Sequence, residues 1–183
     1  MKVGYYMLNL TGINTGKIEL REVNLKKVDL KRSNLLRADL MGADLREANF
    51  EESNLKESHL ELANLERTNL TNADLRCAYL QMSQLKKAIL RNAHLEGAKL
   101  SKANLEKADF SGAYLFMANL EGAYLEGADF TMADLEEANL LGARQLTTEQ
   151  LSRAKTLHNA KLDEELRIQI KMRYPELFEA PRN

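Results

Sequence analysis

Apolar residues recur at every fifth position along most of the chain. From Leu20 to Leu140 every fifth residue is Leu or Phe, and only Phe50, Phe110 and Phe130 are not Leu. We call this position the centre of a repeat. The residue two before the centre is Ala in 17 of the 25 repeats and Ser or Thr in five more, and the residue directly before it is Asp or Asn in 16. Each repeat thus has two small or apolar positions and three mostly polar ones.

A period of five fits neither a regular helix nor a flat strand. On an α-helix five residues rotate by about 500°, so successive centres drift by roughly 140° and form no apolar face. In a strand an odd period sends successive centres to opposite sides of the sheet. The chain must therefore turn once per repeat. We expect an all-β solenoid in which the centres and the small residues point inward and stacked coils pair backbone to backbone, as parallel strands do.

Most glycines lie where such a coil must turn. Six of the nine stand two residues after a centre: Gly42, Gly97, Gly112, Gly122, Gly127 and Gly142. A type II turn needs a positive φ at its third residue, which glycine adopts at little cost. We therefore predict type II corners at these glycines, and more irregular corners where Arg32, Arg37, Glu52 and Glu57 take the same slot.

The repeat unit resembles the A-(D/N)-L-x-x motif of the pentapeptide-repeat family. The resemblance is carried by runs such as RADLMGADL at 37–45 and ANLEGAYLEGADF at 118–130, and it covers residues 18–142. It implies a right-handed quadrilateral parallel β-helix with four repeats, or 20 residues, per coil, and hence about six coils. Residues 20 apart should then stack, which would place Phe50, Phe110 and Phe130 in one column. With its C-terminal cap the chain is also similar to cyanobacterial members, most without an assigned role.

Both ends of the repeat region depart from the pattern. A solenoid end exposes its core and needs a cap. Residues 1–17 form an N-terminal segment whose conformation the pattern leaves open, and residues 143–183 are predicted to be a helical C-terminal cap. Thr147 and Gln150 have the spacing of a capping box for a helix over about 148–155. Asp163 is placed to cap a second helix over 164–173, with Leu166, Ile168 and Ile170 as apolar positions, and homodimerisation through this cap is an alternative role for the helices.

Composition and motifs do not indicate a catalytic or metal-binding site. The 183 residues carry a net charge of −1, so bulk charge recruits neither nucleic acid nor an anionic membrane. A single cysteine, Cys77, excludes an intramolecular disulfide. The chain has no long apolar run and no convincing signal peptide, which favours a cytoplasmic protein. It also contains no phosphate-binding loop, nucleophile motif or set of metal ligands. His59 and His94 occupy outward slots, where solvated side chains are expected. We predict a protein without cofactor or catalytic site.

Charge is unevenly distributed along the rod. Residues 18–100 hold 14 basic and 13 acidic side chains, whereas residues 101–142 hold 2 and 8. The pentapeptide-repeat family includes rods that resemble duplex DNA and protect or inhibit DNA gyrase, and this is one alternative function. That role relies on a long acidic surface, whereas the acidic stretch here covers only about two coils.

The outer pattern lapses in one place. Asp or Asn is missing before five successive centres, where Tyr79, Gln84, Ile89, His94 and Lys99 stand instead. With a 20-residue coil, outward apolar or aromatic residues gather around one edge near this lapse. These candidate partner-binding residues are Leu62, Cys77, Tyr79, Met82, His94, Tyr114, Phe116 and Met117.

Contiguous apolar surface of this kind is typical of a protein-docking site. Scattered exposed apolar residues are also normal, and that interpretation stays open at this point. We predict a non-enzymatic interaction or scaffold protein that binds an unknown protein partner through the outside of the rod. An enzyme with an unrecognised site is a third hypothesis, and a filled core argues against it.

Overall fold

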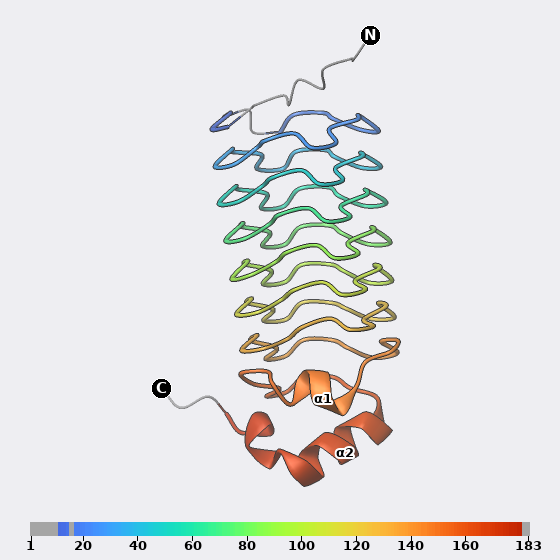
Figure 1. Cartoon of the computed structure of the whole chain (residues 1–183). Helices are drawn as coiled ribbons and strands as arrows, with labels where there is room; N and C mark the ends of the chain where they lie inside the picture. The colour runs from blue at the N-terminus through green and yellow to red at the C-terminus, as the bar shows by residue number, and fades with distance from the viewer. Residues whose placement is uncertain (1–10, 15–16, 181–183) are drawn as a thin grey trace.

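The computed structural model describes residues 11–14 and 17–180, and its repeats form a stack of similar coils (Figure 1). Parallel bridges join residues 20 positions apart, from Asn14 and Asn34 at one end to Tyr124 and Arg144 at the other. One coil therefore holds four five-residue repeats, as the resemblance implied. The span from residue 14 to residue 144 makes between six and seven coils. The coil already includes Asn14, so the predicted start at residue 18 was too late.

Each repeat makes a short extended edge and a corner. Along the edge a single residue bridges to the coils on either side, so no longer strand forms. At the corner the chain changes direction through a tight turn. In the repeat centred on Leu35, the N–H of Ala38 donates to the carbonyl of Leu35 at 2.9 Å, and the N–H of Arg37 donates to Lys56 in the next coil at 2.9 Å. These bonds fix the corner from both sides.

The corners are uniform along the rod, which corrects one prediction. The third turn residue has a φ of 57° at Arg32 and 58° at Glu52, compared with 66° at Gly97. Corners without glycine are therefore not irregular. The reason is that the N–H of this residue bonds to the next coil, for example from Arg32 to Glu51 at 2.9 Å. The stacking imposes the left-handed backbone even where it costs a residue with a Cβ roughly 1–2 kcal/mol.

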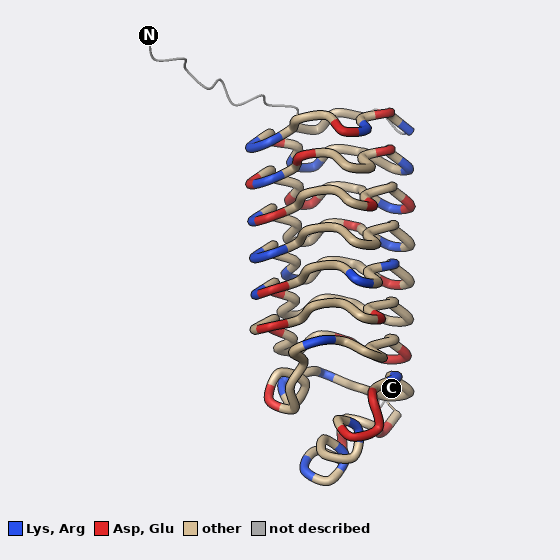
Figure 2. Tube along the Cα trace, turned by 90° about the vertical axis from the view of Figure 1, so that its right-hand side faces the viewer, with Lys and Arg blue, Asp and Glu red and all other residues tan. Residues whose placement is uncertain are grey.

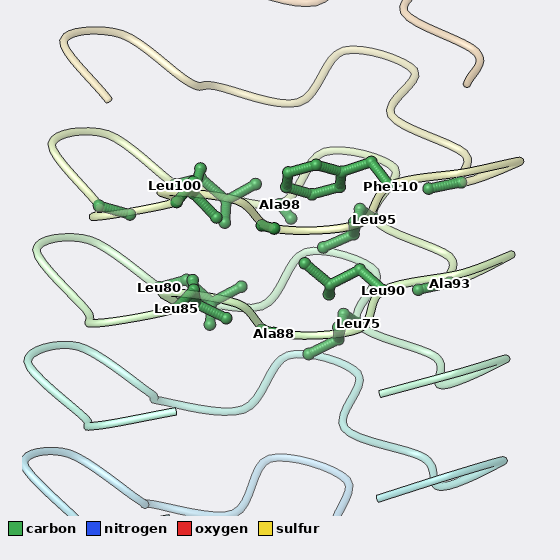
Figure 3. Close-up of a cluster of buried hydrophobic side chains, with 14 of the residues drawn as sticks. Leu75, Leu80, Leu85, Ala88, Leu90, Ala93, Leu95, Ala98, Leu100 and Phe110 are labelled. Carbon is green, nitrogen blue, oxygen red and sulfur yellow. The ribbon is translucent and has the colours of Figure 1, made fainter. Parts of the chain in front are cut away.

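The core is a column of stacked apolar layers. Every centre from Leu25 to Leu140 is buried, and so are the small residues between them from Val28 onward. Phe110 and Phe130 stack with ring centroids 5.2 Å apart and planes at 5°, which confirms the predicted column. Leu90 lies in the coil next to Phe110, in the same column (Figure 3). The interior is thus filled by side chains.

The chain leaves the regular coil after residue 144 and then partly returns to it. Helix α1, Thr148–Leu151, begins with the predicted capping box between Thr147 and Gln150, but it ends four residues earlier than predicted. Thr156 and Lys161 then bridge to residues 22 positions earlier in the last coil, while Leu157 and Leu162 enter the core. The coil therefore continues beyond the predicted limit of 142, as one more partial turn in which α1 replaces a flat edge.

The remaining elements close this end of the rod (Figure 1). Helix α2 spans Glu164–Arg173 as predicted, and the 3-10 helix η1, Pro175–Phe178, follows it. Asp163 precedes α2 but makes no capping bond, because its carboxylate accepts from the N–H of Gly142 at 3.0 Å. Ile170 is buried, whereas Ile168 is 50% exposed. Residues two apart lie on opposite sides of a helix, so the two isoleucines cannot both face the core.

The corner geometry predicts opposite effects of two substitutions at one exposed position. Met132 is a corner residue with φ of 58°, and its N–H donates to Arg153 at 2.8 Å. Met132→Gly should raise the free energy of unfolding by about 0.5–1 kcal/mol, because glycine adopts this backbone without strain. Met132→Pro should lower it by about 3 kcal/mol, because proline fixes a negative φ and removes the N–H. Urea denaturation followed by circular dichroism measures both, and a destabilising glycine would contradict the account.

Candidate protein-interaction surface

One backbone N–H in each repeat has no backbone partner, and it explains the Asp and Asn of the motif. Four of the five N–H groups bond within or between coils, but that of the first corner residue, directly after the centre, does not. At all 16 repeats with Asp or Asn before the centre, the side-chain oxygen accepts from this N–H, as Asn54 does from Lys56 at 3.1 Å. This is an Asx turn, which satisfies the corner locally.

The lapse in the sequence pattern leaves these donors free. At the nine repeats without Asp or Asn, no side chain in the described part of the chain accepts from the corner N–H. Five of these repeats are consecutive, so one full coil has an open donor at every corner. The residues that carry these five N–H groups are Gln81, Lys86, Arg91, Glu96 and Ser101. The lapse is therefore a change in surface chemistry as well as in sequence.

The eight predicted surface residues lie on two adjoining faces and their corners. Stacking through the 20-residue register brings Leu62 next to Met82 and His94 next to Tyr114. The imidazole of His94 and the Tyr114 ring are parallel, with centroids 4.7 Å apart. The largest exposed fractions in the set are 57% for Leu62 and for Met117, which confirms that these side chains point outward. We call the eight residues together the apolar band.

Cys77 and Met117 share one corner column but do not adjoin. Gly97 stands between them, and a Cβ built on this glycine would lie 3.5 Å from the Cys77 thiol sulfur. The thiol is exposed. The structure thus keeps the predicted order of the column, with a notch at Gly97 in place of continuous apolar contact.

Sequence reasoning missed two members of this surface. His59 stacks on Tyr79 with centroids 4.6 Å apart and planes at 4°, and the Lys99 ammonium lies 4.1 Å from the centre of the same Tyr79 ring. Three successive coils thus form a His–Tyr–Lys stack on one face. The 20-residue register contains this signal, because it stacks His59, Tyr79 and Lys99 in one column.

Both histidines of the stacks also face a carboxylate two residues on. His59 Nδ1 lies 3.2 Å from Glu61, and His94 Nδ1 lies 3.1 Å from Glu96. One coil before His94, Asp74 pairs with Arg76. Burial of Asp74 opposes its ionisation, but hydrogen bonds from the guanidinium and backbone of Arg76 outweigh this effect and hold the pKa of the carboxyl below its usual value. The rings are therefore flanked by charged side chains that already have partners.

Comparison with known families identifies the repeat. A family model described as pentapeptide repeat region matches residues 14–90, and a second, described as pentapeptide repeats (8 copies), matches residues 78–115 and 117–144. These matches cover the whole regular coil. The chain belongs to the pentapeptide-repeat family. No curated protein sequence matches it.

Solved structures that are similar include other pentapeptide-repeat proteins. The protein alr5209 of Nostoc PCC 7120 is 29% identical over 60% of this chain and 84% of its own, with a TM-score of 0.47. HetL of Nostoc sp. strain PCC 7120, involved in heterocyst differentiation regulation, is 28% identical over 85% and 83%, with a TM-score of 0.31. A trypsin-treated form of QnrB1, a plasmid-mediated fluoroquinolone resistance protein, is 18% identical over 93% and 98%, with a TM-score of 0.49. The family assignment rests on the repeat models and not on these scores.

Two classes of site are not found in the described part of this pentapeptide-repeat protein. Within residues 11–14 and 17–180, no three His, Cys, Asp or Glu side chains are grouped so that they could hold a metal ion. The helices of the same region are too short or too polar to cross a bilayer.

The free corner donors predict a stabilising substitution on a face away from the apolar band. Ile89 is half-buried and precedes the open N–H of Arg91. In Ile89→Asn the new side chain can accept from this N–H, as Asn69 does from Thr71 one coil earlier. We expect Ile89→Asn to exceed Ile89→Ala by about 1 kcal/mol in free energy of unfolding, the usual net value of one hydrogen bond. Thermal denaturation compares the two, and equal melting temperatures would rule out this role of the Asx bond.

Proposed function

We propose that this pentapeptide-repeat protein is a non-enzymatic interaction protein that binds a protein partner through the apolar band. We further take its coil to be right-handed, as the resemblance implies, and its location to be cytoplasmic. The observation that carries the proposal is the coincidence of two features at one place. Exposed apolar and aromatic side chains gather where the corner N–H groups lose their side-chain partners. A surface with both apolar area and open donors is suited to docking.

The filled interior argues against a substrate site inside the coil. The centres and small residues are buried and pack against one another, so the coil encloses side chains rather than space (Figure 3). An open hollow of about 510 Å³ lies on the outside, along His59, Tyr79 and Cys77. Two of its lining residues, Cys77 and Tyr79, belong to the apolar band.

A gyrase-directed DNA mimic is less well supported. Basic and acidic residues are interspersed along much of the rod (Figure 2). In the early coils the carboxylates are paired across coils, for example Glu52 with Arg32 at 2.7 Å and Glu57 with Arg37 at 2.7 Å. Rows of this kind present neutral pairs, whereas a duplex presents unbroken rows of phosphate. We therefore expect no inhibition or protection in a gyrase supercoiling assay.

Charged substitutions in the apolar band test the proposal. Tyr79→Glu and Phe116→Glu each place a carboxylate among apolar and aromatic neighbours at the surface, which should abolish the capture of a partner. The tagged protein is used to capture its partner from the native host, and mass spectrometry identifies what is bound. The loss should exceed tenfold, since a buried unpaired charge costs several kcal/mol at an interface.

The control for this experiment is an exposed apolar residue on a corner outside the apolar band. Met132 is 62% exposed and lies on the corner diagonally opposite to Leu62 and Met82 in the 20-residue coil. Met132→Glu should leave capture unchanged. All three variants should keep the circular dichroism of the parent. Unchanged capture by the two band variants, or equal loss in the Met132 variant, would refute the proposed surface.

A homodimer through the C-terminal cap is a second proposal. Ile168 and Met172 are four residues apart on α2, so they share one face, and they are 50% and 80% exposed. Such a face is suited to a partner helix from a second copy. Light scattering of the purified chain should then give twice the monomer mass, and Met172→Glu should return it to the monomer mass. A monomeric parent would exclude this dimer.

A further inference from the structure

One corner of the rod carries a short ridge of three side chains. Leu62, Met82 and Lys102 occupy the same corner slot in three successive coils, and Gly42 and Gly122 occupy it on either side. Leu62 is 57% exposed and Met82 is 51% exposed. The flanking glycines have no side chain, and Cγ of Glu22 and Cγ of Lys102 lie 3.3 Å and 3.6 Å from where a Cβ on Gly42 and on Gly122 would stand. We call these three side chains the Leu62 ridge.

A row of open backbone donors runs beside the ridge. The first residues of the same three corners are Glu61, Gln81 and Ser101, and none of their N–H groups has an acceptor among the described residues. Stacked coils are about 4.8 Å apart, so the three donors form a line along the rod. Three consecutive open donors in one column occur here because His59, Tyr79 and Lys99 all replace Asp or Asn.

The free charges next to the ridge are positive. The Lys99 ammonium lies over the Tyr79 ring, and neither Lys99 nor Lys102 forms an ion pair with any residue that the structure describes. Lysines elsewhere on the rod are often paired across coils, for example Lys86 with Glu106 at 2.6 Å. The ridge and the neighbouring Lys99 thus combine two apolar side chains with two ammonium groups that have no ion-pair partner in the described chain.

The carboxylates at this corner are already engaged. Glu61 Oε1 lies 3.2 Å from the imidazole of His59, and Glu121 accepts from the side-chain amide of Asn139 at 3.1 Å. Two acceptors beside the ridge, Glu61 Oε2 and Gln81 Oε1, have no partner but are buried, so the accessible groups without partners are mainly hydrogen-bond donors and positive charges. Their complement is a ligand rich in acceptors and negative charge.

We propose that the Leu62 ridge binds an acidic, extended segment of a partner protein that also carries apolar side chains; this inference rests on the proposed function and specifies its ligand. Carboxylates on the segment meet Lys99 and Lys102, and apolar side chains pack on Leu62 and Met82. The open N–H row requires backbone carbonyls or carboxylates. A helix has bonded most of its carbonyls internally, whereas an extended segment presents them along its edge.

Synthetic peptides of defined composition test the ligand class. Three fluorescent 12-residue peptides with Pro at one position, to prevent helix formation, differ only in their other residues: Asp with Leu, Lys with Leu, and Asp with Ser. Fluorescence anisotropy with the full chain measures their affinities. We expect the Asp/Leu peptide to bind at least about tenfold more tightly than each of the other two, since it alone has both the charge and the apolar groups. Equal binding of the Asp/Leu and Lys/Leu peptides, or no binding of any, would overturn the proposal.

A matched pair of lysines tests the place of binding. Lys102 and Lys87 occupy the same corner slot on different corners, both with φ of 58°, and both are exposed and without an ion pair in the described chain. Lys102→Glu should lower the affinity for the Asp/Leu peptide about tenfold, and Lys87→Glu should lower it less than twofold. Equal effects of the two substitutions would mean that the peptide responds to net charge and not to the ridge.

The role of the donor row has its own test. In Tyr79→Asn the new side-chain oxygen can accept a hydrogen bond from the N–H of Gln81, as at the other Asx corners. In Tyr79→Ala this N–H has no side-chain acceptor. Tyr79→Asn should therefore bind the Asp/Leu peptide about fivefold more weakly than Tyr79→Ala. Equal affinities would remove the donor row from the proposal.

Two variants distinguish a failure of the ridge proposal from a failure of the proposed function. If Phe116→Glu abolishes capture of the host partner while Lys102→Glu leaves capture and peptide binding unchanged, the apolar band stands and the acidic ligand on the ridge is wrong. If Lys102→Glu weakens both capture and peptide binding while Phe116→Glu changes neither, the ridge stands and the wider band is wrong.

Discussion

One backbone group, the N–H of the residue that follows each centre, determines which residues the outer surface of this rod carries before each centre. In most repeats the other four N–H groups bond to backbone carbonyls, three of them in neighbouring coils and one within the corner. The fifth points outward and must be satisfied by a side chain or by water. Asp and Asn are short enough to reach it from two residues earlier, which is the physical content of the second letter of the repeat motif. A residue other than Asp or Asn at this position therefore leaves the corner N–H without a side-chain acceptor.

The interior could be predicted because every repeat has an apolar residue at the same position. A five-residue period excludes helix and flat strand, and this alone places Leu and Ala inside. The four-repeat coil was not predictable from the period, and it came from the family resemblance. The turn preferences of Arg32 and Glu52 do not predict uniform corners. Hydrogen bonds to the next coil impose the backbone conformation there. The return of the chain to the coil at Leu157 could not be predicted, because Leu157 lies 17 positions after Leu140 and so breaks the five-residue period.

The candidate surface was only partly visible in the sequence. Outward apolar residues such as Met82 and Phe116 could be placed from the register, because side chains are read directly. His59 and Lys99 were missed as members, since each looks like an ordinary polar surface residue until its stacking on Tyr79 is seen. The open N–H groups were invisible for a stronger reason. They belong to the backbone, and only the coordinates show that four of the five donors in a repeat are already used.

The lapse over the 79–99 coil weighs against an interpretation of the apolar band as scattered surface residues. Each missing Asx bond forgoes about 1 kcal/mol of stabilisation, and the loss recurs at every corner of one coil. Random drift would scatter such losses along the rod, but five of the nine fall in consecutive repeats, and those at Gln81, Glu96 and Ser101 lie beside exposed Leu62, Met82 and Tyr114. In a rod whose core needs only Leu and Ala inside, the surface can change without disturbing the fold. A local loss of stability at such a surface is expected where another molecule supplies the missing acceptors.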